Sequence, residues 1–324
     1  MHAVTIVDGT LELREHPTPD PGPGEVLVRV HGAGINRADL LQRIGLYPPP
    51  PGVPVDIPGM EFAGEVAAVG PGVDAPAVGT RVFGIVGGGA QAEYLTVHAS
   101  HCAVVPETLD LVAAGGIPEV FITAHDAMRS QAELQPGERV LVHAAGSGVG
   151  TAVVQLAHAL GCPVTGTART ADKLERAREL GLDDAIVVAS GTEPLALAEQ
   201  ISARGAPDVI IDLVGGPYFT ANVLAAAPRA RIVMVGTLAG ANADFPILGA
   251  MGKRLRLFGT VLRPRSVEEK ADATAAFAAE VVPLLASGAI EPIVEQVSAL
   301  ADATEAYDLI ASDSTFGKVI LRPS

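Results

Sequence analysis

The chain has 324 residues, of which 48% are hydrophobic and 18% charged, so it is long enough for two hydrophobic cores and too apolar to be disordered. Its 22 basic and 37 acidic residues give a net charge of −15, which opposes binding to nucleic acid or to an anionic membrane surface. The two cysteines, Cys102 and Cys162, are too few for a disulfide framework or a four-cysteine zinc site.

The first third of the chain is predicted to be rich in β-strands. Residues 1–8 contain neither the basic segment nor the apolar core of a signal peptide, and we therefore expect a cytoplasmic protein. Short apolar runs separated by Gly and Pro follow, among them the partly alternating segment 25–30, and they indicate strands. Residues 48–51 are consecutive prolines and predict a turn-rich loop.

From Pro118 onward, helical segments alternate with short apolar strands, a pattern typical of a parallel α/β sheet. Six strands are predicted, as a complete dinucleotide-binding fold requires, at residues 139–143, 163–167, 185–188, 208–214, 231–235 and 255–260. Helices are expected at 151–160, at 171–180 and from Ser266 onward, and 316–321 is another strand.

Residues 140–168 contain no Asp, Glu, Lys or Arg and are long enough to suggest a membrane span. The segment is interrupted by His143, by several glycines and by Pro163. Because buried parallel strands are continuously apolar, we interpret it as strand, turn, helix and strand inside a globular domain.

A turn of small residues follows the first of these strands and precedes the helix at 151–160. Its residues are Ala144, Ala145, Gly146, Ser147, Gly148, Val149 and Gly150. Such residues let the backbone approach a pyrophosphate, which the N–H groups and dipole of the helix N-terminus attract. Ala145 and Ser147 replace two glycines of the usual motif, so the prediction of a nucleotide site depends on the order of strand, turn and helix.

Two other interpretations of this turn are a purely structural glycine turn and a serine nucleophile. A nucleophile elbow needs glycine two residues on either side of the serine. Ala145 and Val149 occupy those positions around Ser147, and this disfavours hydrolysis.

The end of the second strand predicts which dinucleotide binds. An acidic residue about 20 residues beyond the turn would hydrogen-bond the ribose 2′-hydroxyl of NAD. Arg169, Thr170 and Lys173 stand there instead, and they suit the 2′-phosphate of NADPH. The alternative is a solvated helix face, on which these cations and Arg176 and Arg178 pair with Glu175 and Glu179.

Read together with further segments, these residues resemble the medium-chain dehydrogenase/reductase superfamily over essentially the whole chain. The segments are 34–39 (GINRAD), 58–64 (PGMEFAG), 45–48 (GLYP), 87–89 (GGG), 141–144 (LVHA) and 317–318 (GK), and the last four point to the zeta-crystallin-like quinone oxidoreductase branch. The resemblance implies an α/β fold in which a Rossmann domain, residues 118–263, is inserted into a GroES-like β-barrel catalytic domain, residues 1–117 plus 264–324.

The resemblance also implies that no metal is bound. Zinc-dependent members have a catalytic cysteine where this chain has Asn36 and a histidine where it has Met60, and neither replacement is a good zinc ligand. The structural zinc lobe is missing as well. His98, His101 and Cys102 are close in sequence, but without a second ligand group a core or surface role is expected.

By the same resemblance, Tyr47 and Ser147 are active-site residues and Asn36 assists Tyr47 in hydrogen-bonding the acceptor. The nicotinamide half of the cofactor is expected to meet residues of both domains, namely Asn36, Tyr47, Thr123, Val235, Gly236, Thr237, Arg263 and Lys318. Tyr47 has the alternative role of an aromatic cap on the proline-rich loop. Val188 replaces a tyrosine that relatives place near the adenine, so weaker stacking is expected.

The implied activity is hydride transfer from NADPH to a quinone, or to the β-carbon of an enone, with no metal. The alternatives are a reductase of another α,β-unsaturated carbonyl compound, and an NADPH-binding structural or sensing protein with little turnover. Relatives imply a homodimer or homotetramer.

Overall fold

The computed structural model describes residues 1–324, which divide into two compact units. Unit 1 comprises Met1–Ile122 and Leu262–Ser324, and unit 2 comprises Thr123–Val261. The first division falls within helix α2 (Pro118–His125), and the second falls between β13 (Arg256–Gly259) and α8 (Val267–Glu280).

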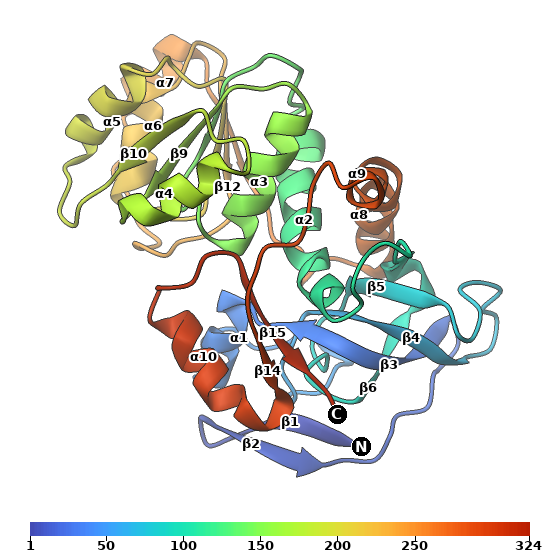
Figure 1. The fold of residues 1–324 in the computed structure, drawn as a ribbon. Coiled ribbons are helices and arrows are strands. Elements are labelled where there is room, and N and C mark those ends of the chain that lie inside the picture. Colours follow the sequence, from blue (N-terminus) through green and yellow to red (C-terminus); the bar gives the residue numbers. More distant parts are fainter. The chain divides into compact units, whose positions relative to one another are not determined.

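Unit 2 contains a parallel six-stranded sheet with the order β10-β9-β8-β11-β12-β13 (Figure 1). Besides β13, its strands are β8 (Val140–Val142), β9 (Val164–Ala168), β10 (Asp184–Val187), β11 (Val209–Asp212) and β12 (Arg231–Met234). All six predicted strands are confirmed, and their order is that of a Rossmann fold. The uncharged segment forms β8, a turn, α3 (Gly148–Ala159) and β9, as interpreted from the sequence.

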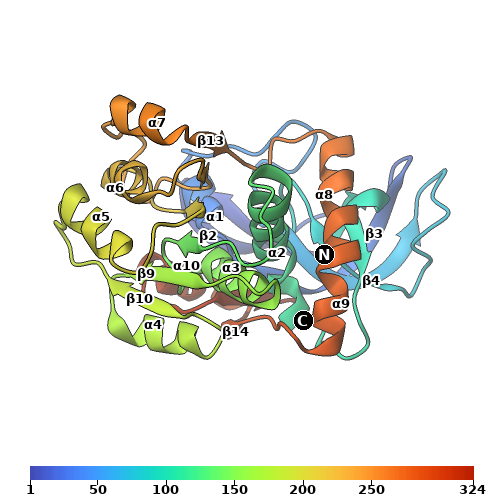
Figure 2. The same ribbon diagram turned by 90° about the horizontal axis from the view of Figure 1, so that it is seen from above.

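The helices of unit 2 cover both faces of its sheet. Helices α3 and α4 (Ala171–Arg178) lie on one face, and α5 (Pro194–Ser202) and α6 (Pro217–Ala225) lie on the other (Figure 2). A π-helix η3 (Asp126–Gln131) and α7 (Ile247–Lys253) complete the unit. No helix in the chain has the length and apolar character needed to cross a membrane.

Unit 1 contains a seven-stranded sheet with the order β14-β15-β3-β4-β5-β7, in which β6 also pairs with β3. The strands are β3 (Glu25–Gly34), β4 (Glu61–Val69), β5 (Arg81–Ile85), β6 (Tyr94–His98), β7 (Cys102–Val104), β14 (Val294–Ala299) and β15 (Lys318–Arg322). Because β15 pairs antiparallel with β3, both ends of the chain build the same sheet. A separate β1–β2 hairpin (His2–Val7 and Thr10–Glu15) precedes β3 in the sequence.

Unit 1 also contains seven helices. They are α1 (Arg37–Arg43), η1 (Ala99–His101), η2 (Ala113–Gly116), α8, α9 (Val282–Ser287), η4 (Leu300–Asp302) and α10 (Ala303–Ala311). Helix α10 contacts α1 and β15, which places the segment before the C-terminal strand against an N-terminal helix (Figure 1). Ser266 begins α8, as predicted, and its Oγ accepts a hydrogen bond from the Glu269 N–H.

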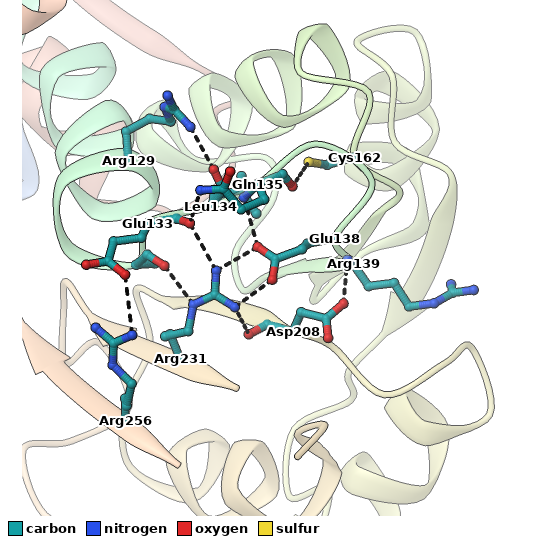
Figure 3. A network of polar contacts seen from close by, with 11 residues as sticks. Arg129, Glu133, Leu134, Gln135, Glu138, Arg139, Cys162, Asp208, Arg231 and Arg256 are labelled. Atoms are coloured by element: carbon teal, nitrogen blue, oxygen red, sulfur yellow. Dashed lines mark hydrogen bonds and ion pairs between the residues drawn. The ribbon is translucent and has the colours of Figure 1, made fainter. Parts of the chain in front are cut away.

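A partly buried ion pair lies at the amino-terminal edge of the sheet of unit 2 (Figure 3). The Arg231 guanidinium donates to both carboxylate oxygens of Glu138, at 2.8 and 2.6 Å. It also donates to the backbone carbonyls of Ala132 and Glu133, so one side chain ties β12 to the segment that precedes β8. Nearby, the Arg256–Glu133 ion pair is exposed at the surface.

Candidate active site

The predicted nucleotide turn links β8 to α3 at the carboxyl end of a central strand. Ser147 is the N-cap residue of α3, and its Oγ accepts a hydrogen bond of 3.1 Å from the Gly150 N–H. A Cβ on Gly150 would lie 2.2 Å from the Ala144 carbonyl oxygen, so only glycine allows this close approach of helix and strand. The N–H groups of Gly148 and Val149 have no acceptor within the helix. Together with the helix dipole, they fit the pyrophosphate of a dinucleotide.

Ala145 stands where the usual motif has a glycine, and a glycine on the neighbouring strand β9 leaves room for its methyl group. The Ala145 side chain is fully buried, as is Gly146. It lies opposite Gly166 of β9, where an added Cβ would be only 2.8 Å from the Ala145 methyl group. The extra methyl group therefore fills space that Gly166 leaves and does not obstruct the turn.

Ser147 was expected to take part in catalysis as well as in cofactor binding. In the structure its oxygen caps α3, which is a structural role of a serine at this position. Its part in the chemistry remains a prediction.

The basic residues expected to select NADPH lie where β9 ends and α4 begins. Arg169 and the N-cap residue Thr170 are exposed, and Lys173 is half-buried in the first turn of α4. Arg178, farther along the helix, forms an ion pair with Glu175 at 3.5 Å. For Arg178, this agrees with the alternative interpretation of a solvated helix face. Binding of a 2′-phosphate at this strand end remains a prediction.

A fully buried polar network that the sequence did not predict lies beneath the turns of unit 2. The Asp212 carboxylate at the end of β11 accepts hydrogen bonds from the N–H groups of Val214 and Gly215, each at 2.8 Å. Asn222 donates to the other Asp212 oxygen at 2.8 Å and lies 2.7 Å from His143 Nε2. Burial lowers the pKa of His143, and the ring is therefore neutral in the folded protein.

The remaining predicted nicotinamide contacts of unit 2 lie in different environments. The Val235 and Gly236 N–H groups bind the Asp212 backbone carbonyl at 2.8 and 3.2 Å, which fixes the turn after β12. Thr237 in the same turn is exposed, whereas Thr123 in α2 is buried.

Val188 is 3% exposed and packs in the core of unit 2 with Leu141 and Ile186. Its side chain is enclosed by this core and offers no surface for stacking. The expectation of weaker adenine stacking remains a prediction.

In unit 1, Lys318, Glu61 and Asn36 form a buried polar cluster. The Lys318 ammonium donates to Glu61 Oε1 at 2.7 Å, to Asn36 Oδ1 at 2.7 Å and to the Ile35 carbonyl at 2.8 Å. The Asn36 amide in turn donates to Glu61 Oε1 at 3.0 Å. All three ammonium protons are used within unit 1. The expected contact of Lys318 with the cofactor and the expected role of Asn36 at the acceptor remain predictions.

The donor set of this cluster does not fit a zinc ion. A cation already occupies the centre of its oxygen atoms, because the Lys318 ammonium is bound there. Met60 beside Glu61 is buried and is a thioether, a ligand that zinc sites rarely use.

Arg263 anchors the proline-rich loop. Its guanidinium donates to the carbonyls of Gly87 and Tyr47, at 2.7 and 3.0 Å, and to Gln42 Oε1 at 2.5 Å. It also lies over the Tyr47 ring, 5.0 Å from the ring centroid. Arg263 is buried, and its contacts position Tyr47. Its expected contact with the cofactor remains a prediction.

Glu119 and Lys270 are titratable residues of unit 1 that the sequence did not single out, and Glu119 lies within electrostatic reach of Tyr47. Glu119, in the first turn of α2, donates its N–H to Glu61 Oε2 at 2.9 Å. Lys270 of α8 is buried and lies within electrostatic reach of Glu119. A signal for Glu119 was present, because it is the only charged residue between 113 and 124.

The residues His98, His101 and Cys102 have structural partners. His98 Nδ1 lies 2.7 Å from Ser100 Oγ, and His101 Nε2 donates to the Val267 carbonyl at 3.0 Å. Burial raises the pKa of the Cys102 thiol to about 12, so it is un-ionised. Nowhere in the chain do three His, Cys, Asp or Glu residues cluster as a metal site requires.

The fold and the nucleotide turn define a two-unit, dinucleotide-binding α/β protein, and comparison with known proteins agrees. Residues 22–107 match the alcohol dehydrogenase GroES-like domain, and residues 148–279 match the zinc-binding dehydrogenase family. The chain is 32% identical to a quinone oxidoreductase of Pseudomonas aeruginosa, over 97% of this chain and 95% of that protein. The chain therefore belongs to the medium-chain dehydrogenase/reductase superfamily, in its quinone oxidoreductase branch.

Other similar proteins include a much longer enzyme and two solved structures of similar length. The chain is 33% identical to the pikromycin polyketide synthase component PikAII of Streptomyces venezuelae, over 94% of its own length but only 8% of that protein. The structure of mycobacterial Rv1454c complexed with NADPH is similar over the full length of both chains, with 29% identity and a TM-score of 0.87. The CurK enoyl reductase structure is 25% identical, with a TM-score of 0.84 over 100% of this chain and 98% of that one.

Proposed function

We propose that this protein is an NADPH-dependent reductase that transfers hydride to a quinone without a metal ion. The observation that supports this most directly is the nucleotide turn of unit 2, followed by the basic residues Arg169 and Lys173 at the end of the next strand. The mycobacterial relative that was solved with NADPH supports the choice of this cofactor.

Backbone N–H groups of the nucleotide turn bind the cofactor, and the positive charges at the end of β9 select NADPH over NADH. The N–H groups of Gly148 and Val149 bind the pyrophosphate, and Arg169, Thr170 and Lys173 bind the 2′-phosphate. NADPH, when bound, supplies a hydride from C4 of its nicotinamide ring.

The acceptor needs a hydrogen-bond donor at the oxygen that gains negative charge. Tyr47 can supply one, because its hydroxyl forms no hydrogen bond within the protein while its ring and carbonyl are held by Arg263. The stacked guanidinium and the prolines that follow restrict the loop, so little entropy is lost when the hydroxyl meets the acceptor.

The second candidate is reduction of an α,β-unsaturated carbonyl compound, which the polyketide synthase and enoyl reductase relatives favour. Both reactions use the same hydride donor and differ in whether the electrons reach a quinone or the β-carbon of an enone. A third candidate, NADPH binding with little turnover, predicts tight cofactor binding and no oxidation with any acceptor.

The experiment that separates these candidates follows NADPH oxidation with a panel of quinones and enones, with and without a chelator. Quinone reduction that survives chelation supports the proposal. Faster reduction of enones supports the second candidate, and tight binding without oxidation supports the third. One zinc ion per chain, lost together with activity, would contradict the metal-free mechanism.

We also propose that two copies associate through the edge strand β13. This strand pairs on one side only, with β12, so its other edge has unpaired backbone groups. Large apolar side chains are exposed on β13 and on the neighbouring α7, among them Leu257, Leu248 and Met251, which are 41, 84 and 66% exposed. A two-fold pairing of β13 with a second β13 would satisfy the edge and cover these side chains.

A further inference from the structure

A hollow of about 510 Å³ lies at the amino-terminal edge of the sheet of unit 2, beside the Arg231–Glu138 ion pair (Figure 3). The nucleotide turn lies at the opposite edge, because it follows the carboxyl end of β8. Pockets that hold small molecules have volumes of roughly 300–1,000 Å³, and the hollow falls in this range. Its charged lining consists of four arginines and the acids Glu133, Glu138 and Asp208.

The four arginines stand at alternate positions on two neighbouring segments of the chain. Arg231 begins β12 and Arg256 begins β13, and these two residues are opposite each other in the parallel pair. Two residues before them, the Arg229 N–H donates to the Lys253 carbonyl at 2.6 Å, which places Arg229 beside Arg254. All four arginines line the hollow, so the pairing of the two strands concentrates positive charge at one place.

The charges deeper in the hollow are already matched. Arg231 donates to both carboxylate oxygens of Glu138 and to neighbouring backbone carbonyls. Arg256 forms an ion pair with Glu133 at 3.4 Å. The third acid, Asp208, accepts a hydrogen bond of 2.9 Å from a backbone N–H and is the single acid of the hollow that forms no ion pair.

Arg229 and Arg254 are the two arginines of the hollow without a partner. Both are exposed, and their side chains form no hydrogen bond or ion pair within the protein. Both also have a left-handed backbone, with φ of 66° and 55°, a conformation that favours glycine. Arg254 has this conformation at the end of α7, where a left-handed residue is usually glycine. Residues held in this way cluster at positions that bind ligands.

We propose that this hollow binds a phosphate dianion, either free or as the monoester of a small molecule, between Arg229 and Arg254. Two unpaired guanidinium groups balance the charge of about −2 that a phosphate carries, and their forked N–H groups match its oxygen atoms. A carboxylate supplies only one charge, and Glu133 and Glu138 already fill that role at the neighbouring arginines. The site does not use the nucleotide turn, so it is additional to the proposed cofactor site.

The test measures binding of inorganic phosphate and of phenyl phosphate by calorimetry, at about pH 7.5 and constant ionic strength. The double variant Arg229→Asn with Arg254→Asn removes both guanidinium groups, and asparagine tolerates the left-handed backbone. It should weaken binding of both probes at least about 10-fold. The matched control is Arg14→Gln with Arg29→Gln, which removes the same charge from exposed ion pairs of unit 1 and should bind as the parent does.

Thermal unfolding supplies a second measurement. A ligand that binds only the folded chain raises its Tm, so phosphate should raise the Tm of the parent and of the control variant but not that of the double variant. Without phosphate, the double variant should have a Tm close to that of the parent, because neither arginine has a partner to lose.

The outcomes also identify the form of the ligand. Tighter binding of phenyl phosphate than of inorganic phosphate assigns the site to a monoester, and equal binding assigns it to free phosphate. The proposal is overturned if millimolar phosphate does not bind the parent, or if the double variant binds as tightly as the parent. It is also overturned if Arg169→Ala abolishes binding, because the phosphate would then occupy the proposed cofactor site.

Discussion

At the residue scale, the Tyr47 ring packs against the Arg263 guanidinium, while the Tyr47 hydroxyl forms no hydrogen bond within the protein. If this hydroxyl hydrogen-bonds the acceptor as charge develops, Tyr47→Phe should lower kcat about 10-fold, a loss of ~1.4 kcal/mol of transition-state stabilisation. The Kd for NADPH, measured by fluorescence titration, should stay near that of the parent. If Tyr47→Phe keeps the kcat of the parent for both quinones and enones, the hydroxyl has no chemical role and Tyr47 is only an aromatic cap on the loop.

A second prediction at this scale concerns the cofactor phosphate. Arg169→Ala should raise the KM for NADPH and leave that for NADH nearly unchanged, a difference of about 1–3 kcal/mol for a charge-assisted contact. Arg178→Ala is the matched control, because it removes an arginine at the far end of the following helix α4, where Arg178 pairs with Glu175. Equal weakening of both cofactors by Arg169→Ala would mean that the basic residues are only a solvated helix face.

At the scale of elements, the Arg231–Glu138 pair connects β12 to the segment before β8 (Figure 3). The Arg231 side chain is 10% exposed, so Glu138→Ala leaves a buried guanidinium without its counter-ion. We expect unfolding by urea at pH 7 to show a loss of about 2–4 kcal/mol. Glu133→Ala should cost less than about 1 kcal/mol, because its pair with Arg256 is exposed.

The same pair should make stability depend on pH. The hydrogen bonds from Arg231 hold the pKa of Glu138 below its ordinary value of 4.5. Its contribution is therefore present above pH 4.5 and is lost as pH falls through the lowered folded pKa. The difference in stability between parent and Glu138→Ala should shrink in strong acid, and a difference that does not change would contradict the ion-pair explanation.

At the scale of the whole molecule, the exposed apolar edge of unit 2 predicts association of two copies. Leu257→Lys on β13 places a charge at the proposed interface and should convert a dimer to a monomer of 33.0 kDa, measured by light scattering after size-exclusion chromatography. The control is Leu195→Lys on α5, where Leu195 is 61% exposed; this helix follows β10, the strand at the opposite edge of the sheet from β13. If both variants keep the mass of the parent, the edge strand is not the interface.

Much of unit 2 was predictable from sequence because its determinants are local. A buried parallel strand is a short apolar run, and a nucleotide turn is a few consecutive small residues between a strand and a helix. The six strands, the N-terminus of α3 and the basic end of β9 could therefore be located without knowledge of tertiary contacts.

The partners of the polar side chains were decided only by the tertiary structure. Lys318 binds Asn36, which is 282 residues away, and no local pattern specifies such a pair. Resemblance placed Lys318, Asn36 and Arg263 beside the cofactor, but their hydrogen-bonding groups are used inside unit 1. Whether a polar group is free to act depends on which groups, distant in the sequence, contact it in the folded chain, and only the tertiary structure decides this.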